Sequence, residues 1–327
     1  MSRWIANRLL ALRTWLRVRL GLWRGQWRRG RVTVSAIPFQ AWLFGGSTWG
    51  YGLYSPTGLP DREAAPLLIV LHGCKQSALR FAHAAGFTRL ADRSRVRLLC
   101  PQQRRLANPW VCGNWFAPLA QAGGSEVQVI LAMLDDVAAQ VHVDTAAVGA
   151  VGLSAGGGLA TLLAFHEPER IRAVAVVAAP PLLGSFAVLD PRDVMRRGLL
   201  FPPSLALGLR QRACAALAII HGAADAVVHP LCAAQLEAQA LESLRRAGID
   251  VARRDTRSTA AETVVDFRSG DALRLRRIDV AGLGHEWAGG PGGHLYCRHG
   301  GPPLTALCAR FLREVGVLGR RRGASAR

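Results

Sequence analysis

The segment that most constrains the fold is residues 148–158, which read Val-Gly-Ala-Val-Gly-Leu-Ser-Ala-Gly-Gly-Gly. An apolar run leads directly into Gly152-Leu-Ser-Ala-Gly156, and a helical pattern follows it. This sequence between a strand and a helix is typical of a nucleophile elbow, a sharp turn that exposes a serine hydroxyl at the end of the strand. The five-residue pattern is weak by itself, and a glycine-rich turn with a bystander serine is the alternative. Its interpretation therefore depends on the rest of the chain.

Apolar runs and helical patterns alternate along the chain. Residues 66–71 read Pro-Leu-Leu-Ile-Val-Leu, a continuous apolar run that is expected of a strand buried on both faces of a sheet. Alternation of such strands with helices predicts a mostly parallel central sheet with helices on both faces. The predicted strands are 49–54, 66–71, 95–100, the apolar run that ends at the elbow, 173–177, 216–220, 264–268 and 272–280, and the predicted helices are 78–94, 126–141, 155–166, 230–247 and 303–315.

Positive charge is concentrated at the two ends of the chain. The formal net charge is +19, residues 1–33 carry nine arginines and no acid, and residues 318–327 carry four arginines and no acid. Over residues 3–24, apolar residues recur mostly every three or four positions with arginines between them, which predicts a basic amphipathic helix. We therefore expect a basic leader helix over 1–33, one large α/β domain over 34–317 and a basic disordered tail over 318–327.

The leader is a candidate for binding to surfaces. Arginine and tryptophan on one helix suit an anionic membrane or a polymer granule, while a helix packed on the body and a loosely ordered leader are the alternatives. No base-reading motif accompanies the charge, so nucleic acid is not an expected partner. We find neither a signal peptide nor a stretch long enough to span a bilayer, which favours a cytoplasmic or a membrane- or granule-surface location. The seven cysteines lack metal-ligand spacing, so no metal or cofactor is expected.

Three residues have the types and the order that acyl transfer by a serine requires. A serine nucleophile needs a base that takes its proton and a carboxylate that orients this base. Ser154 comes first, Asp225 follows 71 residues later, and His285 follows after another 60, each just beyond a predicted strand. Open α/β sheets place their ligands at the carboxyl ends of the strands, and the order serine, acid, histidine is the one found there with this elbow. The sequence therefore predicts that these three residues form a catalytic triad.

The other acids and histidines lie at positions that suit a catalytic role less well than Asp225 and His285 do. Asp190 and Asp193 belong to the proline-rich segment 180–213, which could be a lid or a cap, and not to the end of a strand. The other histidines have different expected roles: His229 borders the site, His294 and His299 lie in a glycine-rich loop, and His72 is structural or helps to hold the loop of the oxyanion hole.

The same arrangement predicts two donors for the oxyanion. One is the backbone N–H of Ala155, directly after the nucleophile, and the other comes from the loop after residues 66–71, where we choose Cys74. The loop 101–123 is rich in large aromatic residues, which suggests a wall of the substrate site, although anchoring of the loop on the core is an equal alternative. The residues expected to bind substrate are Asn114, Trp115 and Trp287.

Five motifs occur together and in order. They are Leu71-His-Gly-Cys-Lys-Gln, Asn108-Pro-x-x-Cys-x-Asn-Trp-Phe116, Gly152-Leu-Ser-Ala-Gly-Gly157, His221-Gly-x-x-Asp225-x-x-Val228 and Gly284-His-x-Trp-x-Gly-Gly290. Over residues 45–315 the chain resembles the poly(3-hydroxybutyrate) depolymerase family of esterases, in the α/β-hydrolase superfamily. The resemblance implies an α/β-hydrolase fold and a serine esterase that uses Ser154, Asp225 and His285, with the amides of Cys74 and Ala155 as the oxyanion hole. It suggests short-chain polyhydroxyalkanoate polyesters or oligomers as substrates.

Several features depart from the family pattern. Gly113 stands where relatives usually carry tryptophan, and residues 180–213 match poorly, so a feruloyl, acetylxylan-type or small soluble ester is the alternative substrate. A non-enzymatic alternative is a granule- or membrane-binding protein with a degenerate hydrolase domain. Family members are often secreted, which makes an extracellular location the alternative. A bridge between Cys74 and Cys112 is conceivable if the protein is exported, and the sequence leaves this open.

Overall fold

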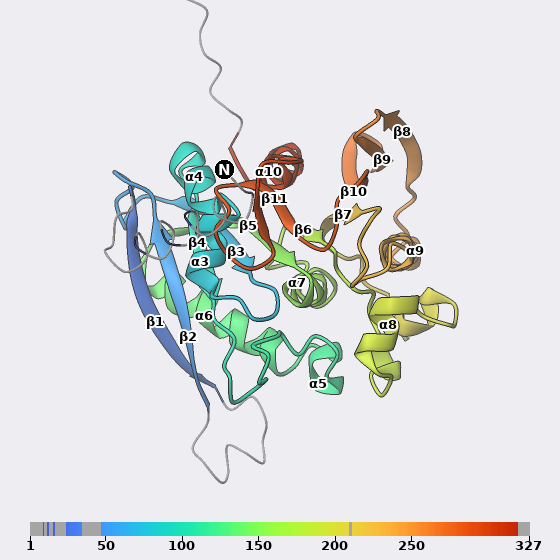
Figure 1. Ribbon diagram of the computed structural model, residues 1–327, viewed down its shortest axis with the longest axis horizontal. Coiled ribbons are helices and arrows are strands. Elements are labelled where there is room, and N and C mark those ends of the chain that lie inside the picture. Colours follow the sequence, from blue (N-terminus) through green and yellow to red (C-terminus); the bar gives the residue numbers. More distant parts are fainter. Residues whose placement is uncertain are drawn as a thin grey trace, which may run out of the picture.

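A ten-stranded sheet forms the centre of the computed structural model, which describes residues 24–34, 47–208 and 211–319 together with Leu9, Leu12 and Leu16. The strand order is β1-β2-β4-β3-β5-β6-β7-β10-β9-β8 (Figure 1). The strands are β1 (Gln26–Val34), β2 (Ser47–Ser55), β3 (Ala65–Leu71), β4 (Arg97–Pro101), β5 (Val143–Leu153), β6 (Ala173–Val177), β7 (Ala216–Gly222), β8 (Ala252–Ser258), β9 (Glu262–Ser269) and β10 (Ala272–Val280), and the short β11 (Trp287–Gly290) and β12 (Cys297–His299) pair separately.

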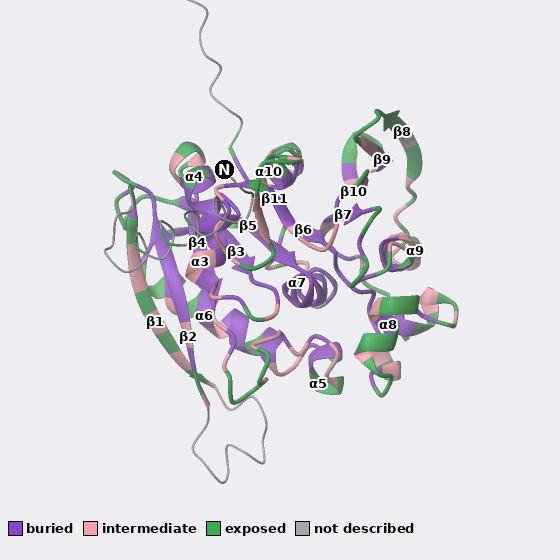
Figure 2. Cartoon of the chain, in the orientation of Figure 1, coloured by how far each residue is buried: buried purple, intermediate pink, exposed green. Residues whose placement is uncertain are grey.

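The middle of the sheet is parallel and its two edges are antiparallel. Strands β4, β3, β5, β6, β7 and β10 all run in one direction. Strand β2 runs antiparallel to β4 and β1, and β9 runs antiparallel to β10 and β8. The parallel strands are buried, whereas the outermost strands β1 and β8 are largely exposed (Figure 2). The predicted mostly parallel α/β sheet is confirmed.

Helices cover both faces of this sheet. The side chains of α6, α7 and α9 belong to the core on one face, and those of α3, α4 and α10 belong to the core on the other. The expected helix over 78–94 is two helices, because Gly86 takes a left-handed conformation (φ 93°) between α3 and α4. The helices are α3 (Ala78–Ala84), α4 (Phe87–Ser94), α5 (Pro118–Gln121), α6 (Glu126–Gln140), α7 (Ala155–His166), α8 (Pro191–Arg197), α9 (Leu231–Arg246) and α10 (Leu304–Glu314).

Strand β1 corrects the expected boundary of the leader. The leader helix was expected to extend to residue 33, but Gln26–Val34 pair along their whole length with β2, and Arg28 forms an ion pair with Asp61 at 2.7 Å. The sheet therefore begins at Gln26, because alternate residues of this segment can pack on the domain while the others remain exposed. The rest of the predicted leader, apart from Leu9, Leu12 and Leu16, and the predicted tail beyond residue 319 lie outside the described residues.

No helix among the described residues is long and apolar enough to span a membrane.

The segment 180–213, expected as a lid or cap, is fastened to the body through buried glutamines. It contains α8 and two short 3₁₀ helices, Gly184–Phe186 and Pro203–Leu207. The side-chain oxygens of Gln121, Gln235 and Gln239 accept hydrogen bonds from backbone amides of the segment at 2.7–2.9 Å. Buried glutamine side chains, instead of a regular helix or strand ladder, satisfy these backbone amides. The segment therefore has no clear periodicity in its sequence.

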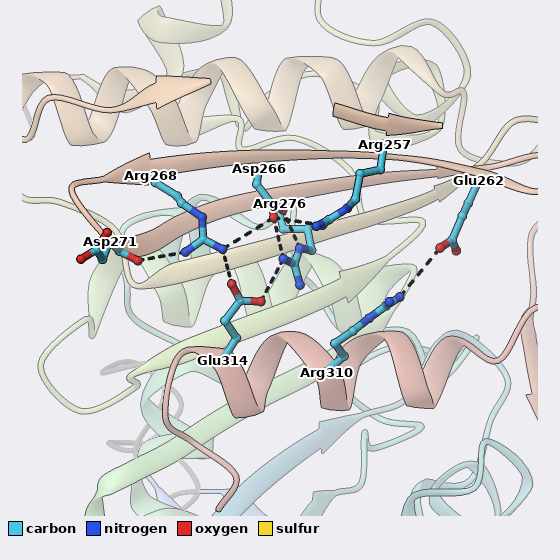
Figure 3. A network of polar contacts seen from close by, with 8 residues as sticks. All are labelled: Arg257, Glu262, Asp266, Arg268, Asp271, Arg276, Arg310 and Glu314. Carbon is cyan, nitrogen blue, oxygen red and sulfur yellow. Dashed lines mark hydrogen bonds and ion pairs between the residues drawn. The ribbon is translucent and has the colours of Figure 1, made fainter. Parts of the chain in front are cut away.

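A network of ion pairs joins the hairpin β9–β10 to α10 (Figure 3). Asp266 is wholly buried, and both of its oxygens accept hydrogen bonds from Arg276 at 2.6 Å. Arg276 also reaches Glu314 of α10 at 2.9 Å, and Arg257 of β8 approaches Asp266 at 3.2 Å. Burial opposes ionisation of Asp266, but the hydrogen bonds and charges of the arginines outweigh it and lower the pKa of Asp266 below its usual range. The network therefore links the antiparallel edge to the core.

We predict that Asp266→Asn lowers the free energy of unfolding by about 3 kcal/mol, because it removes one partner of a buried ion pair. A carboxyl whose pKa is lowered by folding stabilises the protein above the pKa of the unfolded chain, and this contribution disappears as the pH falls. The difference between wild type and variant, measured by urea unfolding, should therefore be largest near neutral pH and shrink below about pH 4. The exposed Asp271 is the matched control, and Asp271→Asn should leave stability unchanged within about 0.5 kcal/mol. Equal losses at all pH values would contradict the assignment.

Candidate active site

Ser154 occupies a strained turn between β5 and α7. Its φ of 55° and ψ of −120° are unfavourable for a residue with a side chain. A Cβ on Gly152 would lie 2.2 Å from the carbonyl oxygen of Gly156, and a Cβ on Gly156 would lie 2.3 Å from the carbonyl oxygen of Leu71. Both glycines are therefore required by the close crossing of α7 over β3 and β5. This conformation directs the side chain of Ser154 away from the core.

The structure brings Ser154, His285 and Asp225 into one hydrogen-bonded row. The Nε2 atom of His285 lies 3.0 Å from Oγ of Ser154, and its Nδ1 atom lies 2.8 Å from Oδ2 of Asp225. The three residues follow β5, β10 and β7, which are parallel strands whose carboxyl ends share one edge of the sheet. Such a row allows His285 to accept a proton from the serine while Asp225 holds the ring.

Asp225 is held in place by its own turn. Its Oδ1 atom accepts hydrogen bonds from the amides of Val227 and Val228, both at 2.9 Å, and Oδ2 faces His285. Burial opposes ionisation of this carboxyl, but the hydrogen bond and charge of His285 and the two backbone amides outweigh it and lower the pKa of Asp225. Asp225 is therefore kept as a carboxylate that can orient the histidine.

His221, at the end of β7, supports the same turn from behind and was given no role by the sequence. Its ring is almost wholly buried, and Nε2 lies 2.8 Å from the carbonyl oxygen of Val228 and 3.7 Å from Oδ2 of Asp225. Burial lowers the pKa of His221, which favours the neutral ring with its proton on Nε2. The peptide groups around Val228 are thus held by Asp225 on one side and by His221 on the other. The signal in the sequence was the spacing of four residues between His221 and Asp225.

The loop after β3 brings Cys74 to the same cavity as Ser154. The amides on either side of Cys74 are already bonded: Gly73 N–H donates to Oε1 of Gln76 at 2.7 Å, and Lys75 N–H donates to the carbonyl of Trp110 at 2.8 Å. Cys74 lines the same cavity as Ser154 and Ala155. Ala155 is the first residue of α7, a position where backbone N–H groups lack partners within the helix. The loop is therefore suitably placed for an oxyanion hole.

Cys74 is also tied covalently to the loop 101–123, which supplies one wall of the cavity. A disulfide joins it to Cys112 in the loop 101–123, and the other five cysteines are free thiols. His72 fixes the base of the loop, since Nδ1 bonds to the carbonyl of Gly73 at 2.7 Å while Nε2 accepts from the amide of Gln103 at 3.1 Å. Burial lowers the pKa of His72, which keeps the ring neutral and suited to this pair of bonds. The position of the Cys74 amide is thus set from two sides.

A cavity of about 300 Å³ opens next to Ser154. The loop 101–123 supplies one wall, including Trp115, which was expected to bind substrate. The opposite wall comes from α8, in the segment 180–213 that was expected to be a lid or a cap, and from the segments after β7 and β11. The lining residues are Gly73, Cys74, Asn108, Trp110, Cys112, Trp115, Phe116, Leu153, Ser154, Ala155, Pro191, Arg192, Met195, Val227, His285 and Tyr296.

Trp287 does not line this cavity, which corrects one sequence expectation. Its side chain is wholly buried and packs edge-on against Phe81, with ring centroids 5.6 Å apart. Its indole N–H donates to Oγ1 of Thr305 at 2.9 Å. A tryptophan in a loop can bind substrate or pack in the core. Trp287 packs in the core, where its indole N–H has a hydrogen-bond partner.

Asn114 is likewise a structural residue rather than a lining one. Its amide N–H and its side-chain Nδ2 both donate to the buried carboxylate of Glu126 at 2.7 Å. Gln103 donates to the same carboxylate and to the carbonyl of Cys112, both at 2.7 Å. The expected alternative, anchoring of the loop 101–123 on the core, therefore applies to Asn114, whereas Trp115 both lies in the core and borders the cavity.

The acids and histidines that were alternatives to Asp225 and His285 form hydrogen bonds or ion pairs elsewhere. Asp190 caps α8 by accepting from the amide of Arg192 at 2.8 Å, and Asp193 pairs with Arg196. Nε2 of His294 accepts from the amide of Ser77 at 3.1 Å, and burial together with nearby positive charge lowers the pKa of His294 to about 4. His229 is exposed, and its Nδ1 accepts from the amide of Leu231.

Comparison with known proteins places this chain among esterases. A sequence model of the family described as Esterase PHB depolymerase matches residues 49–267. Poly(3-hydroxyalkanoate) depolymerase C of Paucimonas lemoignei is 34% identical over 127 residues, 38% of this chain and 30% of that protein, so the match spans less than a third of its length. Feruloyl esterase B of Neurospora crassa is 26% identical over 247 residues, 70% of this chain and 82% of the relative.

A solved structure supports the same fold. An acetyl xylan esterase from Aspergillus awamori superposes with a TM-score of 0.63 and 16% identity, covering 79% of this chain and 94% of that one. At this identity the likeness establishes the α/β-hydrolase fold.

We predict that His221→Phe slows the reaction of Ser154 with a fluorophosphonate probe by on the order of tenfold, because loss of the Nε2–H donor frees the turn that holds Asp225. His229→Phe is the control, since His229 is exposed and contacts neither Asp225 nor His285 in the described contacts. The labelling rate is measured at a temperature where both variants are folded by circular dichroism. Equal rates in the two variants would show that His221 only fills space.

Proposed function

Because the chain belongs to the PHB depolymerase family of esterases, we propose that it is a serine esterase that hydrolyses carboxylic esters through an acyl-enzyme on Ser154. The observation that carries this proposal is the unbroken row from Ser154 through His285 to Asp225, with hydrogen bonds of 3.0 and 2.8 Å. This row ends in a cavity whose other walls are mostly apolar, as an ester substrate requires.

In the proposed mechanism, Oγ of Ser154 attacks the ester carbonyl while its proton passes to Nε2 of His285. The carboxylate of Asp225 stabilises the imidazolium that forms. The amides of Cys74 and Ala155 bind the negatively charged oxygen of the tetrahedral intermediate, and each such donor contributes roughly 3–4 kcal/mol to lowering the barrier. His285 then returns the proton to the departing alcohol. Water repeats the sequence on the acyl-enzyme and releases the acid.

We propose short-chain hydroxyalkanoate esters, as polyester or as oligomers, for the acyl group. A cavity of about 300 Å³ favours a small acyl chain, and one relative is named a poly(3-hydroxyalkanoate) depolymerase. The second candidate is a feruloyl or acetyl ester. The aromatic wall of Trp110, Trp115 and Phe116 favours it, since an aromatic acyl group could stack there, and another relative is named a feruloyl esterase.

We predict that Ser154→Ala lowers kcat for a p-nitrophenyl ester at least 10⁴-fold and abolishes fluorophosphonate labelling, because the nucleophile is lost. Ser204→Ala, outside the cavity, is the matched control and should keep full activity. The wild type is then compared on hydroxybutyrate oligomers, feruloyl esters and acetyl esters by kcat/KM. An active Ser154→Ala protein would refute the acyl-enzyme, and an inactive wild type would favour the non-enzymatic alternative.

We also propose that the part of the leader before β1 holds the protein on an anionic membrane or granule surface. Leu9, Leu12 and Leu16 are helical, are spaced by three and four residues, and are 37–51% exposed, which gives one face an apolar stripe. The arginines of this segment would add attraction to an anionic surface.

We predict that deletion of residues 1–23, which spares β1, abolishes sedimentation with vesicles containing anionic lipid and leaves hydrolysis of a soluble ester unchanged. The full chain should detach as the salt concentration rises, because the attraction is partly electrostatic. Undiminished sedimentation of the shortened protein would refute a role of the leader.

A further inference from the structure

Arg192 is the one permanently charged side chain in the lining of the cavity. The other lining residues in the described part of the chain are apolar, aromatic or neutral polar groups, apart from His285, and none of them is an acid. Arg192 lies in the first turn of α8, which belongs to the segment 180–213 and faces the nucleophile from the side opposite the loop 101–123. A neutral ester can accept a hydrogen bond from this guanidinium, but it has no negative charge that would form an ion pair with it.

Contacts within the protein orient the guanidinium of Arg192 but occupy only some of its N–H donors. Asp190 accepts from Nε of Arg192 at 3.2 Å and from Nη2 at 3.1 Å, which occupies one edge of the group. Asp190 also accepts from the amide of Arg192, so both ends of the residue are tied to the same carboxylate. A guanidinium has five N–H donors, and those of Nη1 form no hydrogen bond with the residues that the structure describes. The side chain is 76% exposed, so these donors remain accessible.

A second cation stands on the other side of the cavity. Lys75, the only lysine of the chain, follows Cys74, and its Nζ atom lies 4.5 Å from the ring centroid of Trp110, which lines the cavity. Lys75 and Arg192 place two positive charges beside the cavity, and although Asp190 pairs with Arg192, no acid belongs to the described lining, so we expect a net positive field there. Such a field raises the encounter rate with anionic substrates and gives nothing to neutral ones.

We infer that the site selects esters that carry a carboxylate remote from the scissile bond, and that Arg192 binds this carboxylate. The inference rests on the proposed esterase function and narrows its substrate class. Among hydroxyalkanoates it points to short oligomers with a free carboxyl end, since the interior of a polymer chain has no charge to pair with Arg192. Arg192 is thus a residue that determines specificity and takes no part in the transfer of protons or acyl groups.

The test compares two esters that differ mainly in the remote charge: p-nitrophenyl butyrate and the mono-p-nitrophenyl ester of glutaric acid. We expect Arg192→Gln to lower kcat/KM for the glutarate ester about fivefold, mostly through KM, because an exposed charge pair contributes about 1 kcal/mol. The value for the butyrate ester should stay within about twofold. Arg192→Glu should lower the glutarate value further, and added salt should weaken the wild-type preference.

Arg196→Gln is the matched control. Arg196 lies one turn later in α8, pairs with Asp193 at 3.5 Å and does not line the cavity, so its loss should leave the ratio of the two esters unchanged. If Arg192→Gln changes kcat/KM equally for both esters, or for neither, the inference is wrong. The esterase proposal is unaffected by that result. A wild type that hydrolyses neither ester, nor any ester of the wider panel, would instead refute the proposed function.

Discussion

The close crossing of α7 over β3 and β5 is the constraint on which the site depends. It forces Ser154 into a conformation with positive φ, which costs of order 1–3 kcal/mol and persists only because the surrounding structure fixes it. Gly152 and Gly156 have no room for a Cβ, so the helix can approach the strands closely enough to hold the turn. The buried parallel strands on either side supply the rigidity that this strain requires, and they place the partners of Ser154 at the same edge.

Around this turn, each group that faces the cavity is held by a second group that does not. His221 and two backbone amides support Asp225, while His72 and Gln76 hold the loop of Cys74. Glu126 gathers the loop 101–123 through Asn114 and Gln103, and the disulfide transmits this anchoring to Cys74. Burial raises the pKa of Glu126, but three donors to its carboxylate offset much of that effect. Such support would keep the proposed oxyanion donors and Ser154 within the narrow geometry that acyl transfer needs.

The parts of the fold that sequence analysis predicted are those with local, repetitive signals. The helix over 155–166 and the strand over 173–177 have the predicted bounds, because each is a continuous apolar run and the mostly polar residues 167–172, which include Pro168, separate them. Strands β1 and β8 were missed, since their exposed, arginine-rich sequences resemble a solvated helix or loop until they pair with a neighbour. For the same reason the roles of Trp287 and Asn114 were misjudged: a side chain in a loop shows its partner only in three dimensions.

The sequence by itself determined the pattern of the elbow, the order serine, acid, histidine, and the parallel sheet. The elbow and each strand depend on residue types next to one another, and the order of the three residues can be read directly along the chain. The tertiary structure decided which loops meet over Ser154, that Cys74 joins Cys112, that His221 supports Asp225, and that Arg192 faces the cavity. These contacts join segments from different strand ends, and their distances follow from the packing of helices on the sheet. No local pattern encodes that packing, so the sequence indicated the residues of the proposed chemistry, while the walls that face Ser154 could be described only from the structure.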